Sequence, residues 1–205
     1  MRRLMEVLLI VAVSTSATDA GGVNIGVGGG FDFPVKDPTG DDPTMGISKR
    51  SMGFNLLTNL EYKAIQHIGF VGHYGWNRFD NDDGTKIVGL NTPPSHVIST
   101  SYGLNLRYYH NPISSSMFFI SAGIANYSTE RKSEATGFSE ETTVQYEDVM
   151  GYNAGAGTRI RLSQKNSLDI SAKAHFYSTK EEGSEGDRID FYHISVTALI
   201  NFGVI

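Results

Sequence analysis

Apolar and polar residues alternate with a period of two along most of the chain. The segment 194–202 shows this clearly, because all its even positions are apolar while its odd positions carry Ser, Thr, Leu and Asn. A period of two indicates a β-strand with one apolar face. About eight such segments follow one another. Their apolar faces are almost free of charge over the roughly nine to eleven residues that a tilted strand needs to cross a bilayer.

The alternation predicts eight strands joined by connections of two lengths. The predicted strands are 23–33, 52–64, 68–77, 98–109, 118–128, 150–162, 168–177 and 193–202. The connections are long at 34–50, 79–97, 129–144 and 179–188, and short at 66–67, 110–116 and 163–166. Long loops at one end and short turns at the other are typical of bacterial outer-membrane barrels. We therefore predict an all-β fold, an eight-stranded antiparallel up-and-down transmembrane β-barrel with both termini in the periplasm.

The polar faces of the strands indicate which side of the barrel meets lipid. They carry Gly, Ser and Asn beside a few charges, which suits a narrow lumen, whereas a soluble barrel would expose many Lys and Glu side chains. Aromatic residues also gather near both ends of the strands, as at lipid headgroups. We expect the apolar face to point outward. The alternative is a soluble lipocalin-like lipid binder with an apolar interior.

The first 20 residues have the order of a secretory signal peptide. Basic residues at 2–3 precede an apolar run at 4–13, and small residues follow at 14–20. Cleavage would follow Ala17 or Ala20, which leaves 21–205 as one outer-membrane barrel domain. The alternative is a short buried helix or strand of the mature protein.

Composition excludes several function classes. A net charge of −5, with no block of Lys and Arg, gives a nucleic acid nothing to bind. The absence of Cys excludes disulfides, thiolate zinc sites and thiol nucleophiles. A mean hydropathy of −0.21 is too polar for a bundle of membrane helices but suits a barrel with a polar lumen.

The chain resembles the small eight-stranded outer-membrane β-barrel family of the OmpX-like and OmpA transmembrane-domain type. The resemblance rests on the Gly-rich segment VGGGF at 27–31, on GYNAGAG at 151–157, and on the final INF at 200–202. It implies a monomer in the bacterial cell outer membrane, in contact with lipid and lipopolysaccharide, inserted by the barrel-assembly machinery. Family members commonly end in Phe, whereas this chain continues with GVI at 203–205.

Seven charged residues are predicted to face the lumen, mostly in the half of the barrel near the short turns. They are Glu61, Lys63, Arg107, Arg159, Arg161, Asp169 and Lys173. Opposite charges in such an interior should pair, because unpaired buried charges are costly. Side chains just fill the interior of an eight-stranded barrel, so we expect this cluster to close the lumen. The alternative is a narrow porin-like channel for ions or small solutes.

Two further motifs have both a structural and a functional interpretation. His193 and Ser195 resemble part of the motif of the outer-membrane lipid A deacylase, but no Asp or Glu follows Ser195 to orient the His, and both residues fall on the predicted lumen face. We expect them to form lumen hydrogen bonds. The stretch DNDDG at 80–84 has the carboxylates of a calcium site but does not match an EF-hand, so a solvated turn is favoured.

These observations predict a non-enzymatic protein that acts in envelope integrity or surface interaction through its long extracellular loops. We expect no catalytic residue, no cofactor and no metal site, and we expect an extracellular ligand, if one exists, to bind the loops. A lipid-directed hydrolase is the least favoured alternative.

Overall fold

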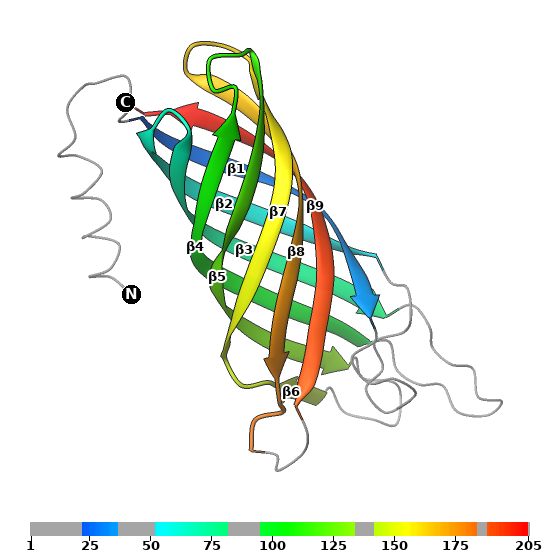
Figure 1. Ribbon diagram of the computed structural model, residues 1–205. Coiled ribbons are helices and arrows are strands. Elements are labelled where there is room, and N and C mark those ends of the chain that lie inside the picture. Colours follow the sequence, from blue (N-terminus) through cyan, green and yellow to red (C-terminus); the bar gives the residue numbers. More distant parts are fainter. Residues whose placement is uncertain (1–21, 37–51, 82–94, 134–141, 184–187, 205) are drawn as a thin grey trace.

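The protein forms one antiparallel sheet of nine strands closed into a barrel (Figure 1). The computed structural model describes residues 22–36, 52–81, 95–133, 142–183 and 188–204. The strands are β1 Val23–Lys36, β2 Gly53–Ile65, β3 Ile68–Asn81, β4 Ser95–His110, β5 Ser116–Ser133, β6 Thr142–Gln145, β7 Val149–Arg161, β8 Asn166–Thr179 and β9 Ile189–Gly203. In the described part of the chain no helix is long and apolar enough to span a membrane.

The strand order confirms the predicted barrel. Neighbours follow the order β4-β3-β2-β1-β9-β8-β7-β5, and pairing of β4 with β5 closes the ring. Every pairing is antiparallel. Eight strands therefore form the barrel, and β6 is an extension of the β7 segment along β5.

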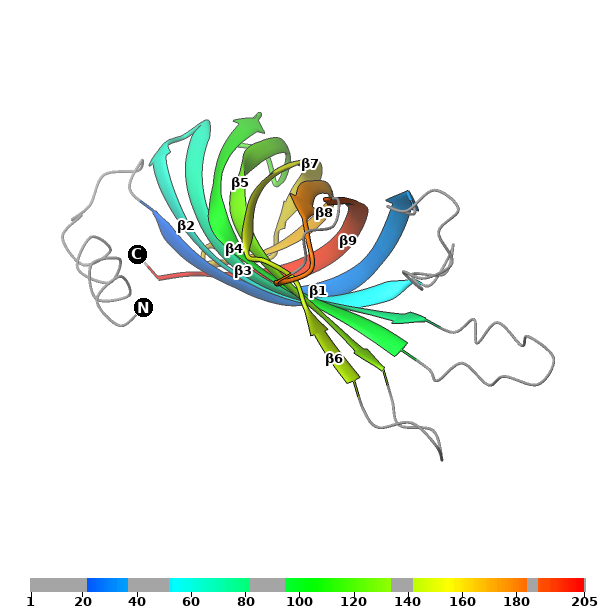
Figure 2. The same cartoon turned by 90° about the horizontal axis from the view of Figure 1, so that it is seen from below.

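The break between β6 and β7 is a bulge. β5 pairs with β7 up to Tyr127 opposite Val149, and with β6 from Glu130 opposite Gln145, so the register shifts by one residue between these pairs. An extra residue in one strand bends the ladder in this way. The prediction of a loop over 129–144 was therefore too wide, because the ladder continues where side-chain alternation no longer marks it. The ends of β3, β4 and β5, together with β6, project beyond the barrel (Figure 2).

The short turns lie at one end of the barrel, together with the C-terminus (Figure 1). β2 and β3 are joined by the turn at 66–67, as predicted. In the turn between β4 and β5, Asn111 has a φ of 52°, a left-handed conformation that Asn tolerates better than most residues. The predicted signal peptide at 1–20 lies outside the described residues, as do most residues of the predicted long loops.

Apolar side chains cover the outside of the barrel, as predicted. Leu104 is 55% exposed and Ile120 is 52% exposed, whereas the inward-facing Asn55 and Asn105 are 3% and 2% exposed. The outward aromatic residues include Tyr108 and Phe118 near the short turns, and Tyr74 and Tyr152 nearer the long loops. A lipocalin-like barrel, which needs an apolar interior, does not fit this arrangement.

The Gly-rich segment of β1 allows β1 and β9 to pack closely. A Cβ on Gly28 would overlap the carbonyl oxygen of Ala198, and one on Gly30 would overlap that of Val196. Both of these carbonyls belong to β9. Glycine at 28 and 30 is therefore needed for this pair of strands to complete the ring.

Candidate functional site

The lumen is filled by two groups of side chains at different heights. We call the group near the short turns the charged cluster: Glu61, Lys63, Arg107, Tyr109, Arg159 and Asp169. We call the group near the long loops the aromatic cluster: Phe79, Tyr127, His175, Tyr177, Phe191 and His193. The side chains come from different strands, and their inward direction follows from the two-residue period of each strand.

Arg159 is the centre of the charged cluster. Its Nε donates to Asp169 Oδ1 at 2.6 Å and its Nη2 donates to Asp169 Oδ2 at 2.8 Å. Its Nη1 lies 2.7 Å from Glu61 Oε2. Arg159 and Asp169 are direct partners in the register of β7 and β8, so their two-pronged contact is set by the strand pairing. Such bidentate pairs are the strongest ion pairs and fix the geometry of both groups.

Arg107 connects the same two carboxylates from β4. Its Nη1 lies 2.8 Å from Asp169 Oδ2 and 3.9 Å from Glu61 Oε2. The same atom donates to the Tyr109 hydroxyl at 3.1 Å, and that hydroxyl donates to Glu61 Oε1. Two guanidinium groups and two carboxylates thus balance one another in charge.

Apolar side chains complete the seal around these charges. Tyr109, Met117 and Phe119 form a buried cluster in which none is more than 2% exposed. The Arg107 Cζ lies 4.1 Å from the centre of the Phe119 ring, a cation–π distance. Charged and apolar side chains are thus buried together at this height of the lumen.

Four of the seven predicted lumen charges come together as paired ions: Glu61, Arg107, Arg159 and Asp169. Lys63 joins them differently, with its Nζ 4.5 Å from the centre of the Tyr109 ring. Lys173 faces the lumen nearer the aromatic cluster, beside His175. Arg161, the last residue of β7, is exposed and takes no part in these ion pairs among the described residues. It lies past the level that Tyr109 and Phe119 seal, where water can hydrate it.

Ring stacking dominates the aromatic cluster. The rings of His175 and His193 are parallel within 5° with centres 4.4 Å apart. Tyr177 stacks on Tyr127 with centres 4.2 Å apart and on Phe191 with centres 5.1 Å apart. His175 and His193 are direct partners in the register of β8 and β9, which explains why two inward imidazoles meet face to face.

Neutral hydrogen bonds hold the aromatic cluster in place. The Tyr127 hydroxyl lies 2.9 Å from His175 Nδ1. The Tyr177 hydroxyl lies 3.3 Å from Ser99 Oγ and 3.4 Å from Thr129 Oγ1. Sequence reasoning missed this cluster as a candidate site. The only signal was that these aromatic residues share the phase of the inward positions on their strands, and this phase does not show which of them meet.

His193 and Ser195 do not form a nucleophile and base pair. Ser195 Oγ donates to Asp32 Oδ1, and Asn55 Nδ2 donates to the same oxygen at 2.9 Å. His193 stacks instead on His175. Both His193 and Ser195 are buried in the lumen, as predicted. The arrangement therefore gives no support to the hydrolase interpretation, which requires a base beside the serine hydroxyl.

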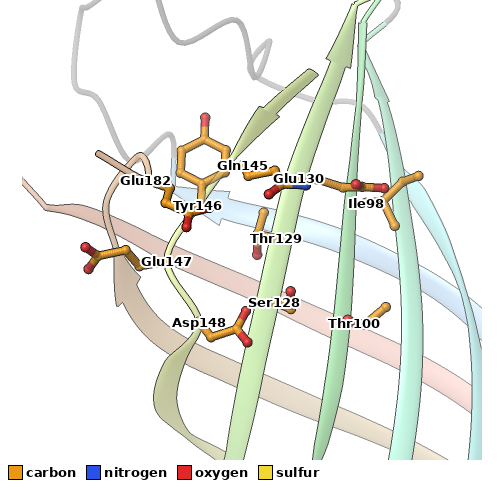
Figure 3. Close-up of a pocket in the computed structure, with 10 residues that line it drawn as sticks. All are labelled: Ile98, Thr100, Ser128, Thr129, Glu130, Gln145, Tyr146, Glu147, Asp148 and Glu182. Carbon is orange, nitrogen blue, oxygen red and sulfur yellow. The ribbon is translucent and has the colours of Figure 1, made fainter. Parts of the chain in front are cut away.

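A hollow with a volume of about 770 Å³ lies at the bulge between β6 and β7. Figure 3 shows its lining, in which Asp148 points toward β5 and Glu147 points the opposite way. Glu147 pairs with Lys180 at 3.2 Å, and Glu130 pairs with Lys132 at 2.9 Å. Burial raises the pKa of Tyr146, which packs on Phe191 of the aromatic cluster.

The structure gives no support to a calcium site in the described chain. No group of three or more His, Asp or Glu side chains among the described residues could hold a metal ion. Most of the stretch 80–84 lies outside the described residues. Elsewhere at the loop end, Glu181 and Glu182 are exposed.

Comparisons with solved structures agree on the fold. No protein-family model matches the sequence, and no curated protein matches it. Neisserial surface protein A is 11% identical over 88% of this chain and 96% of its own, with a TM-score of 0.62. Ail, the attachment invasion locus protein of Yersinia pestis, is 15% identical over 89% of this chain and 99% of its own, with a TM-score of 0.51. OprG, an outer membrane protein of Pseudomonas aeruginosa, is 12% identical over 89% of this chain and 97% of its own, also with a TM-score of 0.51. The chain thus has the fold of the small eight-stranded outer-membrane β-barrels.

Proposed function

We propose that this chain is a non-enzymatic protein of the bacterial outer membrane, whose filled barrel holds extracellular loops for envelope integrity or surface interaction. The strongest support is that the barrel is apolar on its outside and charged on its inside, the reverse of a water-soluble protein. Residues such as Leu104 and Ile120 are half exposed outside, while Glu61 and Asp169 are buried inside. A continuous apolar outer surface is stable in lipid and is a liability in water.

The filled lumen supports a structural role over transport. The charged cluster and the aromatic cluster occupy successive heights of a barrel that is already narrow at eight strands. A solute would have to displace paired ions and stacked rings to pass. The surface that remains for a partner is the loop end, where the 770 Å³ hollow lies beside the base of β6.

The structural neighbours support the same location and role. Ail is named for attachment and invasion, and OprG is named an outer membrane protein. By analogy, the partners of this chain are outer-membrane lipid and lipopolysaccharide, the barrel-assembly machinery during insertion, and an extracellular ligand at the loops. Residues 1–20 would direct its export.

Membrane fractionation combined with gel mobility tests the location. We expect the protein in the outer-membrane fraction, with an electrophoretic mobility that changes on boiling because the closed barrel resists detergent until it is heated. A soluble periplasmic protein whose mobility does not change would contradict the proposal.

A charge on the lipid-facing surface tests the orientation of the barrel. Leu104 lies between the outward Tyr102 and Tyr108 on β4, so it should sit near the middle of the bilayer. Leu104→Arg should lower the free energy of unfolding in lipid vesicles by about 2–4 kcal/mol. Leu162→Arg, just past the end of β7, is the matched control and should cost no more than about 1 kcal/mol. Equal effects of the two changes would argue against a membrane-spanning belt.

Conductance distinguishes the scaffold from the channel. The purified protein in a planar bilayer should give no discrete conductance steps, because the charged cluster closes the lumen. Regular steps would favour the porin-like alternative.

A loop replacement tests the surface role. Replacing 82–94 by a short turn should leave the heat-dependent mobility unchanged while reducing attachment of expressing cells to host surfaces. Unchanged attachment in variants of all four long loops would contradict the surface role.

A further inference from the structure

A small chamber, to which several polar side chains contribute, lies in the lumen between the charged cluster and the aromatic cluster. Its volume is about 20 Å³. Its walls include His73 from β3 and Lys173 and His175 from β8. A cavity of this size holds one water-sized particle.

Lys173 brings a positive charge to this chamber without a matching carboxylate. Among the described residues it forms no ion pair. Asp169, four residues earlier on the same strand, is bound by Arg159 and Arg107. Asp32 is separated from Lys173 by Ser195 in the strand register. Its Oδ1 is bound by Ser195 and Asn55, while its Oδ2 has no hydrogen-bond partner among the described residues.

The neutral contacts of Lys173 do not balance its charge. With the Asn105 amide turned so that its nitrogen donates to Asn153 Oδ1, its oxygen accepts from Lys173 Nζ at 3.0 Å. An amide oxygen satisfies one of the three donors of an ammonium group. Lys173 is partly buried, and a charge held away from water without a counter-charge is destabilising, so the remaining donors call for an anionic partner.

His73 offers a second donor from another wall of the chamber. Its side chain is 7% exposed, and neither ring nitrogen has a hydrogen-bond partner among the described residues. At least one of the two nitrogens of an imidazole carries a proton. Buried polar groups are almost always hydrogen-bonded, so a ligand in the chamber would supply the hydrogen-bond partner that the surrounding side chains do not.

We infer that this chamber binds one small monovalent anion, such as chloride, between the Lys173 ammonium group and an N–H of His73. Water alone would satisfy His73 but would leave the charge of Lys173 without a counter-charge. The volume leaves no room for a tetrahedral anion such as sulfate or phosphate. This inference is independent of the role of the loops, because it concerns only the interior of the barrel.

Bromide provides a direct test, because it replaces chloride and scatters X-rays anomalously. Crystals of the full-length protein soaked in sodium bromide should show one anomalous peak within hydrogen-bond distance of Lys173 Nζ and a His73 ring nitrogen. A chamber that contains water and no anomalous peak would overturn the inference, and so would peaks confined to the protein surface.

Thermal unfolding in detergent gives a second test with matched variants. At equal ionic strength, chloride should raise the unfolding midpoint relative to gluconate by roughly 3–6 °C at about ten times the dissociation constant. The effect should vanish in Lys173→Met. It should persist in Lys63→Met, which removes the lumen lysine that lies over the Tyr109 ring. A chloride effect that is absent from the wild type, or unchanged in Lys173→Met, would refute the site.

Discussion

The charged cluster and the aromatic cluster fill the same lumen by opposite means. The charged cluster buries two carboxylates and two guanidinium groups, joined by contacts of 2.6–2.8 Å between Arg159, Asp169 and Glu61. The aromatic cluster is held by three stacked and three edge-to-face ring pairs. The hydrogen bonds described for it join neutral groups, such as Tyr127 and His175. The two clusters differ in how much stability the loss of one side chain should cost.

Removing one ion from the charged cluster leaves another ion buried without its partner. Removing one hydroxyl from the aromatic cluster leaves only a neutral group unpaired, which costs less free energy. The aromatic cluster also continues outward, since Phe191 packs on Tyr146 at the bulge. The charged cluster is thus suited to closing the barrel near the short turns. The aromatic cluster is suited to supporting the base of the loops.

The largest effect should come from Arg159→Met. This change removes both contacts to Asp169 and the contact to Glu61, so two buried carboxylates lose most of their counter-charge. We expect a loss of about 3–5 kcal/mol in the free energy of unfolding, measured by urea titration in lipid vesicles.

Arg161→Met is the matched control for that change. Arg161 lies two residues further along β7 and is exposed, so its replacement should leave the unfolding midpoint unchanged. A similar loss of stability in both variants would mean that the loss comes from removing one positive charge and not from breaking the ion pairs of the charged cluster.

Tyr109→Phe should have an intermediate effect. The hydroxyl donates to Glu61 and accepts from Arg107, so its loss weakens two bonds to charged groups while the ring keeps its place against Phe119. Hydrogen bonds to charged groups contribute about 1.5–3 kcal/mol, and we expect a loss in that range in the same titration. No loss would show that Arg107 and Glu61 close the gap directly.

Much of the barrel could be predicted from the sequence because strand alternation is local. The two-residue period placed all eight barrel strands and separated outward Leu104 from inward Asn105, as the structure confirms. The strand ends were less accurate. β5 continues to Ser133 and pairs with β6, since main-chain hydrogen bonds can extend a ladder where the apolar alternation stops.

The composition of the clusters was harder to predict, because alternation gives the face of a residue but not its height in the barrel. Arg107 meets Asp169 across 62 positions of sequence, and this meeting depends on the register of every strand between them. For the same reason Arg161 and Lys173 were grouped with the charged cluster, although one is exposed at its edge and the other lines the chamber beyond it.

The smallest effect should come from Tyr127→Phe, which makes in the aromatic cluster the same chemical change that Tyr109→Phe makes in the charged cluster. The Tyr127 hydroxyl has a neutral partner, His175 Nδ1, at 2.9 Å, and the stacking of the ring on Tyr177 is kept. A neutral hydrogen bond contributes about 0.5–1.5 kcal/mol, so the loss in the urea titration should be smaller than that of Tyr109→Phe. If the two hydroxyls prove equally important, the division of the lumen into an ionic half and a neutral half would fail.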